Sequence, residues 1–246
     1  MRATRILMGM PITVEVVGAT DATAIDAVFG YFEEVDRRFS TYRSDSEITA
    51  INRGCLTPAD FSKEMREVLA LAEQTRRETD GFFDIRTGNG LDPSGIVKGW
   101  AIRNAAKIIA DTSADDFFID AGGDIQSAGK NPEGGDWSVG IRNPFDPTQI
   151  VKVVYPHGHG VATSGTYVRG QHIYNPHARD REIADIVSLT VIGPDVLEAD
   201  RFATAAFAMG ADGIYFIEQM PMLEGYVIDA QGCATLTSGF NRYSAS

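Results

Sequence analysis

The residues best suited to chemistry lie in two segments of this sequence, 161–174 and 198–204. The first reads VATSGTYVRGQHIY and leads from a Gly turn with several hydroxyl groups to His172, and the second reads EADRFAT and contains Asp200 and Thr204. Glycine and small residues let a ligand approach the backbone closely, and the ordinary pKa of histidine is near neutral. Together the two segments indicate a site that handles phosphate.

Each of these residues has a chemical and a structural interpretation. Asp200 and Thr204 are four apart, so on a helix they share one face, where their oxygen atoms suit Mg²⁺. Alternatively, Thr204 bonds back to its own helix while Asp200 faces solvent. His172, in a predicted strand, could remove a proton from an attacking hydroxyl group, or it could be structural. The local sequence leaves both interpretations open.

Two other segments could contact a ligand. Residues 92–98, DPSGIVK, place Asp92 and Lys98 at the entrance of a predicted helix, where free N–H groups and the helix dipole favour phosphate. The alternative is a capped helix with Lys98 in solvent. Residues 120–124, DAGGD, follow a predicted strand and either admit a ligand or form a turn.

Hydrophobic periodicity predicts the elements that must position these residues. The first strand is expected at residues 12–17, followed by a helix that is capped by Thr20 or Asp21 and extends to Phe39. Further helices are expected at residues 46–52, 62–79, 96–110 and 196–209. Further strands are expected at residues 117–120, 137–142, 150–155, 161–163, 172–174, 185–192, 225–229 and 234–237.

This order of elements predicts an α+β fold. The chain is rich in helices at its beginning, rich in strands in its middle and mixed at its end, which differs from a regular βαβ alternation. We expect one domain over residues 1–246, built from two α/β sublobes with mixed or antiparallel sheets and a cleft between them.

Composition excludes several classes of protein. The chain has 246 residues, 43% of them apolar, which is enough for a buried core. Its formal charge of −12 argues against a nucleic-acid-binding surface. The sequence has no apolar run of about 20 residues that could span a bilayer and no export signal, so a cytoplasmic location is expected. Cys55 and Cys233 have no metal-ligand spacing, and a disulfide is not expected.

Taken in order, the segments resemble the ApbE family, the FAD:protein FMN transferases. The resemblance extends over nearly the whole chain, and it depends on the collinear set of motifs more than on any one of them. The matching segments are residues 8–10, 38–42, 46–48, 52, 81–84, 92–101, 120–125, 137–144, 162–176 and 199–210.

The resemblance implies an enzyme that binds FAD with Mg²⁺ and transfers FMN to a Thr or Ser hydroxyl of a client flavoprotein, releasing AMP. It also implies roles for individual residues. Met8, Tyr42, Phe82, Phe83 and Asp84 would contact FAD, Asp92 and Lys98 would close on its adenosine diphosphate part, and Ile183 would make a backbone contact near the adenine. The carbonyl of Gly95 would bind the metal together with Asp200 and Thr204, and His172 would be the general base.

Three departures from the family pattern are visible. Asp84 and Asp92 are only eight residues apart, where the family has a long segment. The second motif reads DPSGIVKG, and the segment HIYNPHAR after His172 lacks the usual Thr-Gly. We therefore expect a compact member of the family. The alternatives are an Mg²⁺-dependent FAD diphosphatase that forms FMN and AMP, and a non-catalytic FAD-binding protein.

Overall fold

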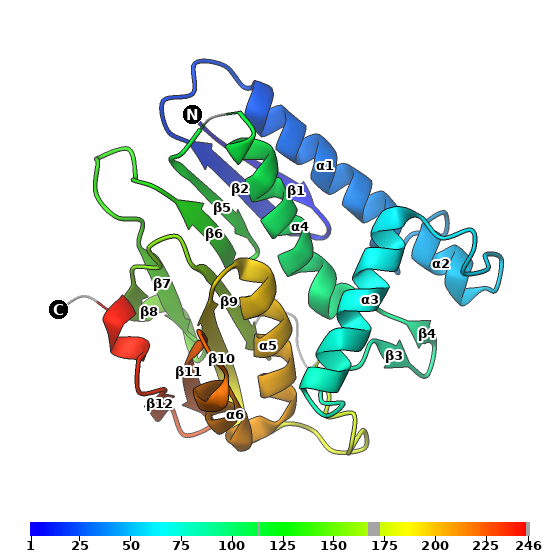
Figure 1. Ribbon diagram of the computed structural model, residues 1–246. Coiled ribbons are helices and arrows are strands. Elements are labelled where there is room, and N and C mark those ends of the chain that lie inside the picture. Colours follow the sequence, from blue (N-terminus) through cyan, green and yellow to red (C-terminus); the bar gives the residue numbers. More distant parts are fainter. Residues whose placement is uncertain (113, 167–172, 245–246) are drawn as a thin grey trace.

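The fold is organised around one antiparallel sheet of eight strands (Figure 1). The computed structural model describes residues 1–112, 114–166 and 173–244. Within them the strand order is β1-β2-β5-β6-β9-β10-β11-β12. The strands are β1 (Arg2–Leu7), β2 (Met10–Val16), β5 (Phe117–Ala121), β6 (Asp124–Ala128), β9 (Gly160–Gly165), β10 (Ile186–Gly193), β11 (Glu224–Asp229) and β12 (Ala234–Leu236).

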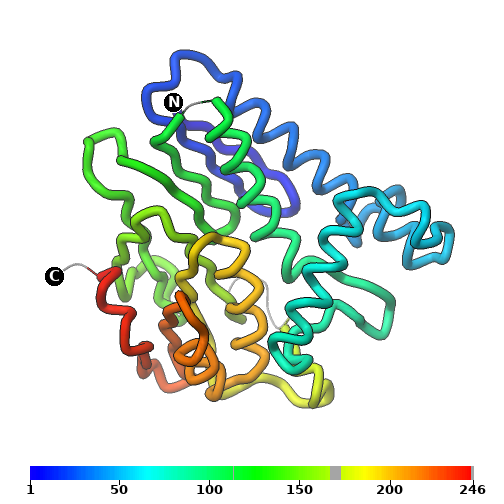
Figure 2. The backbone as a smooth tube through the Cα atoms, viewed as in Figure 1, coloured from blue at the N-terminus to red at the C-terminus, as the bar shows by residue number. Residues whose placement is uncertain are grey.

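Helices cover one face of this sheet and form two neighbouring cores. The first core contains Phe29 and Trp100, and the second contains Phe202 and Phe207. The α1 and α4 helices lie side by side over the first strands, and α5 lies over β9 and β10 (Figures 1 and 2). The helices are α1 (Thr23–Phe39), α2 (Glu47–Asn52), α3 (Lys63–Glu78), α4 (Ser94–Ala110), α5 (Val196–Ala208) and α6 (Gly213–Gln219), with 3₁₀ turns at Gly210–Asp212 and Phe240–Tyr243.

A hairpin covers part of the opposite face. It consists of β7 (Val139–Asn143) and β8 (Asp146–Val154). Successive residues of a strand point to opposite faces, and on β9 Val161 packs with the hairpin core whereas Ala162 packs under α5. A second, very short hairpin joins β3 (Arg86–Thr87) to β4 (Gly90–Leu91).

The sheet is stepped at one end, and this step matters for the site. β6 pairs with β9 only through Ile125–Val161 and Gln126–Gly160. Beyond this point β5 and β6 are joined by a tight turn at residues 122–123, while β9 continues along β10 as far as Gly165. The β5–β6 turn therefore ends before β9 does. The space beside the turn connects the helix-covered face of the sheet with the hairpin-covered face.

Most predicted elements are confirmed, and the α+β class with antiparallel sheets is correct. Ser46 and Ser62, where two of the helices were expected to begin, cap these helices. The predicted cap of the first helix is wrong: α1 begins at Thr23 after Ala22, and Asp21 accepts a hydrogen bond from the Thr23 N–H at 2.9 Å. The strands β1 and β6 and the helix α6 were not predicted.

The predicted strand at residues 172–174 is also wrong in its described part. Ile173 and Tyr174 are not in a strand, and His172 lies outside the described residues. The Tyr174 hydroxyl instead donates to the carbonyl of Arg86 at 3.3 Å, so this segment is held by loop contacts and not by a sheet ladder. No helix in the described part of the chain has both the length and the hydrophobicity needed to cross a bilayer.

Arg201 ties α5 to α3 through a buried network. Its side chain donates to Glu198 at 2.6 Å, to Thr75 at 3.1 Å and to Glu78. Arg201 itself is 5% exposed. Since a buried guanidinium needs all of its partners, this network fixes the position of α5 relative to the helices of the first core.

Replacing Arg201 by Met should therefore lower the free energy of unfolding by about 2–3 kcal/mol, because Glu78 and Glu198 lose their cation while partly buried. Urea denaturation measures this change. Arg37→Met is the control, since Arg37 and Glu34 form an exposed pair and its loss should cost less than about 0.5 kcal/mol. Equal effects of the two substitutions would contradict a structural role for the network.

Candidate functional site

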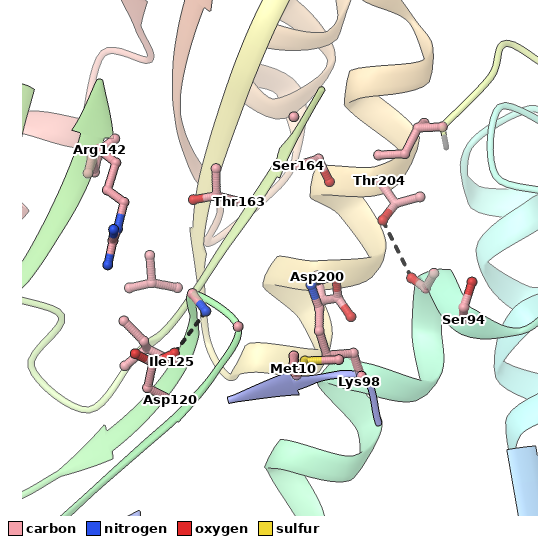
Figure 3. A pocket seen from close by; sticks show the side chains of 18 of the residues that line it. Met10, Ser94, Lys98, Asp120, Ile125, Arg142, Thr163, Ser164, Asp200 and Thr204 are labelled. Atoms are coloured by element: carbon pink, nitrogen blue, oxygen red, sulfur yellow. Dashed lines mark hydrogen bonds and ion pairs between the residues drawn. The ribbon is translucent and has the colours of Figure 1, made fainter. Parts of the chain in front are cut away.

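A cavity of about 840 Å³ opens where the sheet is stepped (Figure 3). Its walls come from the N-terminal part of α4, from α5, from the β5–β6 turn and from the β7–β8 hairpin. The N-terminus of α4 faces the cavity with Ser94 and Gly95. The cavity therefore extends around the turn from the helix-covered face of the sheet to the hairpin-covered face.

Lys98 and two carboxylates form the polar centre of the helix side. The Lys98 ammonium lies 2.6 Å from Asp124 Oδ2 and 3.9 Å from Asp200 Oδ1. Asp200 Oδ2 accepts a hydrogen bond from the Gly99 N–H at 2.7 Å, and Asp124 Oδ1 accepts one from the Thr163 N–H at 3.1 Å. The Lys98 ammonium therefore offsets part of the cost of burying two carboxylates side by side.

Burial changes the protonation of Asp200. Desolvation raises the pKa of this carboxyl to about 7, and the neighbouring charge of Asp124 acts in the same direction. The Lys98 ammonium and the hydrogen bond from Gly99 oppose the increase. A carboxyl that is costly to ionise gains from a cation placed beside it, so the site favours a positively charged ligand next to Asp200.

Two oxygen atoms from different helices converge one turn away from Asp200. Thr204 Oγ1 lies 3.5 Å from the Gly95 carbonyl oxygen, and the close packing of α4 and α5 brings them together. A Cβ at Gly95 would lie 3.3 Å from the Thr204 methyl group and 3.3 Å from the Phe83 ring. With Asp200 Oδ1, these atoms are the hard oxygen donors that suit Mg²⁺.

The donor set fits a magnesium ion that completes its shell with water or substrate. Among the residues that the structure describes, no three His, Cys, Asp or Glu side chains gather around a point that could hold a metal ion. One carboxylate, one hydroxyl and one carbonyl are too few for a closed cage. Mg²⁺ usually keeps several waters and shares substrate phosphates, so an incomplete set of this kind is compatible with it.

The loop before α4 supplies another wall. Phe82, Phe83, Asp84 and Asp92 all line the cavity. Phe83 is buried, and Asp92 Oδ1 accepts a hydrogen bond from the Ser94 N–H at 3.0 Å, which shapes the entry into α4. The sequence predicts a possible ligand contact at this helix entrance. In the structure the residues of the loop and Lys98 line the same cavity.

A model of the ApbE family matches residues 8–90 and 86–227 of the chain. The chain belongs to the ApbE family. It is 25% identical to the FAD:protein FMN transferase of Escherichia coli (strain K12), over 80% of this chain and 74% of that protein. It is 23% identical to the FAD:protein FMN transferase of Haemophilus influenzae, over 85% of this chain and 79% of that protein.

Solved ApbE structures have the same fold. The flavin transferase ApbE from Vibrio cholerae superposes with a TM-score of 0.85 at 23% identity, covering 99% of this chain and 98% of that chain. The ApbE protein from Thermotoga maritima superposes with a TM-score of 0.86 at 20% identity, covering 100% and 99% of the two chains.

The structure brings together most of the residues that the ApbE resemblance singled out. Among the described residues of this set, those that line the cavity of about 840 Å³ are Phe82, Phe83, Asp84, Asp92, Gly95, Lys98, Asp200 and Thr204. Met8 does not line it, although its neighbours Gly9 and Met10 do. Tyr42 is 99% exposed and also lies off the cavity wall. The FAD contacts of Met8 and Tyr42 stay predictions.

Ile183 and His172 stand apart from this group. Ile183 is 8% exposed, packs in the core under α5 and borders a separate, smaller hollow. Ile183 does not line the cavity of about 840 Å³, and its backbone contact with the adenine stays a prediction. The proposed general base, His172, lies outside the described residues, so its role stays a prediction of the sequence.

Sequence reasoning missed several residues of the cavity. Asp124 was noted only as part of the DAGGD segment, and its pairing with Lys98 has no local signal. Arg142 and Ile150 of the hairpin also line the cavity and were not singled out. The pairing of the strands would have been needed to find them, because these residues come to the same cavity as Lys98 from distant parts of the chain.

The contact of α4 with α5 can be tested at Gly99. A Cβ there would lie 2.7 Å from Asp200 Cβ and 2.8 Å from the Val196 carbonyl oxygen. Gly99→Ala should lower the free energy of unfolding by about 2 kcal/mol and weaken Mg²⁺ binding, because the two helices must separate. Thermal denaturation and metal titration measure the two effects.

Gly30→Ala is the matched control for this substitution. Gly30 also lies within a helix, α1, and an added Cβ would have no atom within 4 Å. Alanine there should raise the free energy of unfolding by about 0.5–1 kcal/mol, since it removes conformational freedom from the unfolded chain. If Gly99→Ala were also stabilising, the close approach of the helices would be disproved.

The raised pKa of Asp200 predicts a pH-dependent stability. The folded protein binds the Asp200 proton up to pH of about 7, whereas an unfolded chain releases it near pH 4, so the contribution of Asp200 to stability falls as the pH rises between these values. With chelator present, the stability of the wild type relative to Asp200→Asn should fall from pH 5 to pH 8. Urea denaturation across this range tests it, and a constant difference would refute the buried, hard-to-ionise carboxyl.

Proposed function

We propose that this protein is an FAD:protein FMN transferase, which moves FMN from FAD to a Thr or Ser hydroxyl of a client flavoprotein and releases AMP. The observation that carries the proposal is the convergence of Lys98, Asp200, Thr204 and the Gly95 carbonyl at the N-terminal end of α4. Relatives in the same family carry this activity in their names. The cavity volume of about 840 Å³ suits a dinucleotide.

The residues of the helix side can orient a diphosphate without a basic protein surface. The N-terminus of α4 and the Lys98 ammonium, which is shared by Asp124 and Asp200, lie beside the cavity in a chain with a net charge of −12. Mg²⁺ held by Asp200, Thr204 and the Gly95 carbonyl would neutralise charge on the phosphate oxygens. Phe82 and Phe83 supply apolar wall beside these groups.

The transfer itself is a displacement at phosphorus. The client hydroxyl oxygen forms a bond to the FMN phosphorus, the bond from that phosphorus to the bridging oxygen breaks, and the bridging oxygen leaves with AMP. The hydroxyl proton must go to a base, and His172 is the residue that the family pattern places in this role. Positioning and charge stabilisation supply most of the acceleration in such reactions.

A cytoplasmic location and the single domain over residues 1–246 stay predictions.

The proposal is tested by incubating the protein with FAD, Mg²⁺ and a client flavoprotein, then looking for flavin fluorescence on the denatured client. Labelled client supports transfer. Free FMN without labelled client identifies an FAD diphosphatase, in which water replaces the client hydroxyl. Bound FAD that is never turned over identifies a binding protein, and both of these results contradict the proposal.

Replacement of a proposed metal ligand sharpens this test. Thr204→Val keeps the shape of the side chain and removes its oxygen, and it should lower the transfer rate by roughly 10- to 100-fold, the range seen even for groups that only support metal ligands. The control is Thr235→Val on the exposed part of β12, outside the cavity. Loss of transfer in both variants, or in neither, would count against the metal site.

A further inference from the structure

The cavity has a second half, on the hairpin-covered face of the sheet. Ile125, Val139, Ile141 and Val161 give it apolar walls, and Ile150 reaches into it from β8. The side chain of Ile150 packs over the backbone of β7, where a Cβ at residue 140 would lie 2.9 Å from it. This half of the cavity therefore has an apolar surface, whereas the helix side is lined by charged groups.

Two charged residues stand at the edge of this apolar half. Arg142 extends from β7 toward Asp120, which lies at the end of β5 (Figure 3). Asp120 Oδ1 accepts a hydrogen bond from the Gly123 N–H at 2.8 Å, which leaves Oδ2 for a ligand. Among the described residues, no hydrogen bond or ion pair within the protein occupies the Arg142 guanidinium.

The burial of Asp120 adds to the case for a ligand there. Desolvation and the nearby charge of Asp124 raise the pKa of its carboxyl, and the hydrogen bond from Gly123 and the positive charge of Arg142 oppose the increase. The Arg142 guanidinium, which donates hydrogen bonds, and the Asp120 carboxylate, which accepts them, thus line the same part of the cavity beside its apolar wall. A ligand that fits must have an apolar end and a polar edge with both a hydrogen-bond acceptor and an N–H donor.

We propose that Arg142 and Asp120 recognise the pyrimidine edge of the flavin ring, with Arg142 donating to a ring carbonyl and Asp120 accepting from the ring N3–H. The proposal rests on the proposed function, because it assigns the flavin half of FAD to the hairpin side and the diphosphate to the helix side. The dimethylbenzene end of the ring packs against the isoleucine and valine side chains. Adenine offers a polar edge but no apolar end, so it matches this half less well.

The pair then determines which dinucleotide the enzyme accepts. A polar site left unpaired by the wrong ligand is costly, so Arg142 and Asp120 select against dinucleotides that place another ring in this half. Neither residue touches the reacting phosphorus in this arrangement. Their effect should therefore be found in binding of the ring, and it should be separable from binding of the phosphates.

The test uses riboflavin, which has the flavin ring but no phosphate or adenosine, and ADP with Mg²⁺, which has no flavin ring. Arg142→Met should weaken binding of riboflavin and of FAD by about tenfold each, the effect of one charge-assisted hydrogen bond. Binding of ADP should change less than about twofold. Quenching of flavin fluorescence and calorimetry measure the affinities. Lys152→Met, which removes the same charge from β8 outside the cavity wall, is the matched control and should change none of them.

The Asp120 contact is tested from the ligand side. The wild type should bind riboflavin about tenfold more tightly than 3-methylriboflavin, which lacks the N3–H, and Asp120→Ala should remove this preference. Because Asp120 also holds the β5–β6 turn, that variant could fail to fold, but the preference of the wild type is measured without it. Equal binding of the two flavins by the wild type would overturn the proposal.

Two further outcomes separate this proposal from the proposed function. If Arg142→Met weakened ADP and left riboflavin unchanged, the pair would hold the nucleotide half and the proposal would be wrong. If flavin were attached to the client while Arg142→Met left riboflavin binding unchanged, the result would support FMN transfer and contradict flavin recognition by Arg142. If Arg142→Met weakened riboflavin binding as expected but no client were ever labelled, the result would support flavin recognition and contradict FMN transfer.

Discussion

The close contact between α4 and α5 at Gly99 is the constraint on which the site depends. The Gly99 N–H donates to Asp200 at 2.7 Å, and no side chain fits between the helices at this point. This contact sets the positions of Lys98 on one helix and Thr204 on the other. It also brings the Gly95 carbonyl to the Thr204 hydroxyl, so a single packing distance defines the whole set of oxygen donors.

Function at this contact has a cost in stability. Two carboxylates, Asp124 and Asp200, are 1% and 4% exposed and share the Lys98 ammonium. Burial of like charges is unfavourable, and a chain selected only for stability would place apolar residues there. The apolar cores on both sides and the Arg201 network hold the helices in place against this cost. A bound cation would relieve the repulsion, so the site is arranged to be most stable when loaded.

The stepped end of the sheet explains how one cavity offers two environments. The helix side carries Lys98, Asp124 and Asp200 beside the N-terminus of α4, whereas the hairpin side carries apolar walls with Arg142 and Asp120 at their edge. A dinucleotide has the same division between its diphosphate and its rings. An acidic protein can bind such a ligand if Mg²⁺ supplies positive charge locally, beside Asp200 and Thr204.

The sequence by itself determined the helices with strong periodicity and the common face of Asp200 and Thr204, because each follows from contacts within a few residues. The collinear motifs also determined the family. Only the tertiary structure decided that Lys98 pairs with Asp124, that Ile183 packs in the core, and that Arg142 and Asp120 line the same cavity. These outcomes depend on strand register and on helix packing between segments far apart in the chain, which local spacing does not encode.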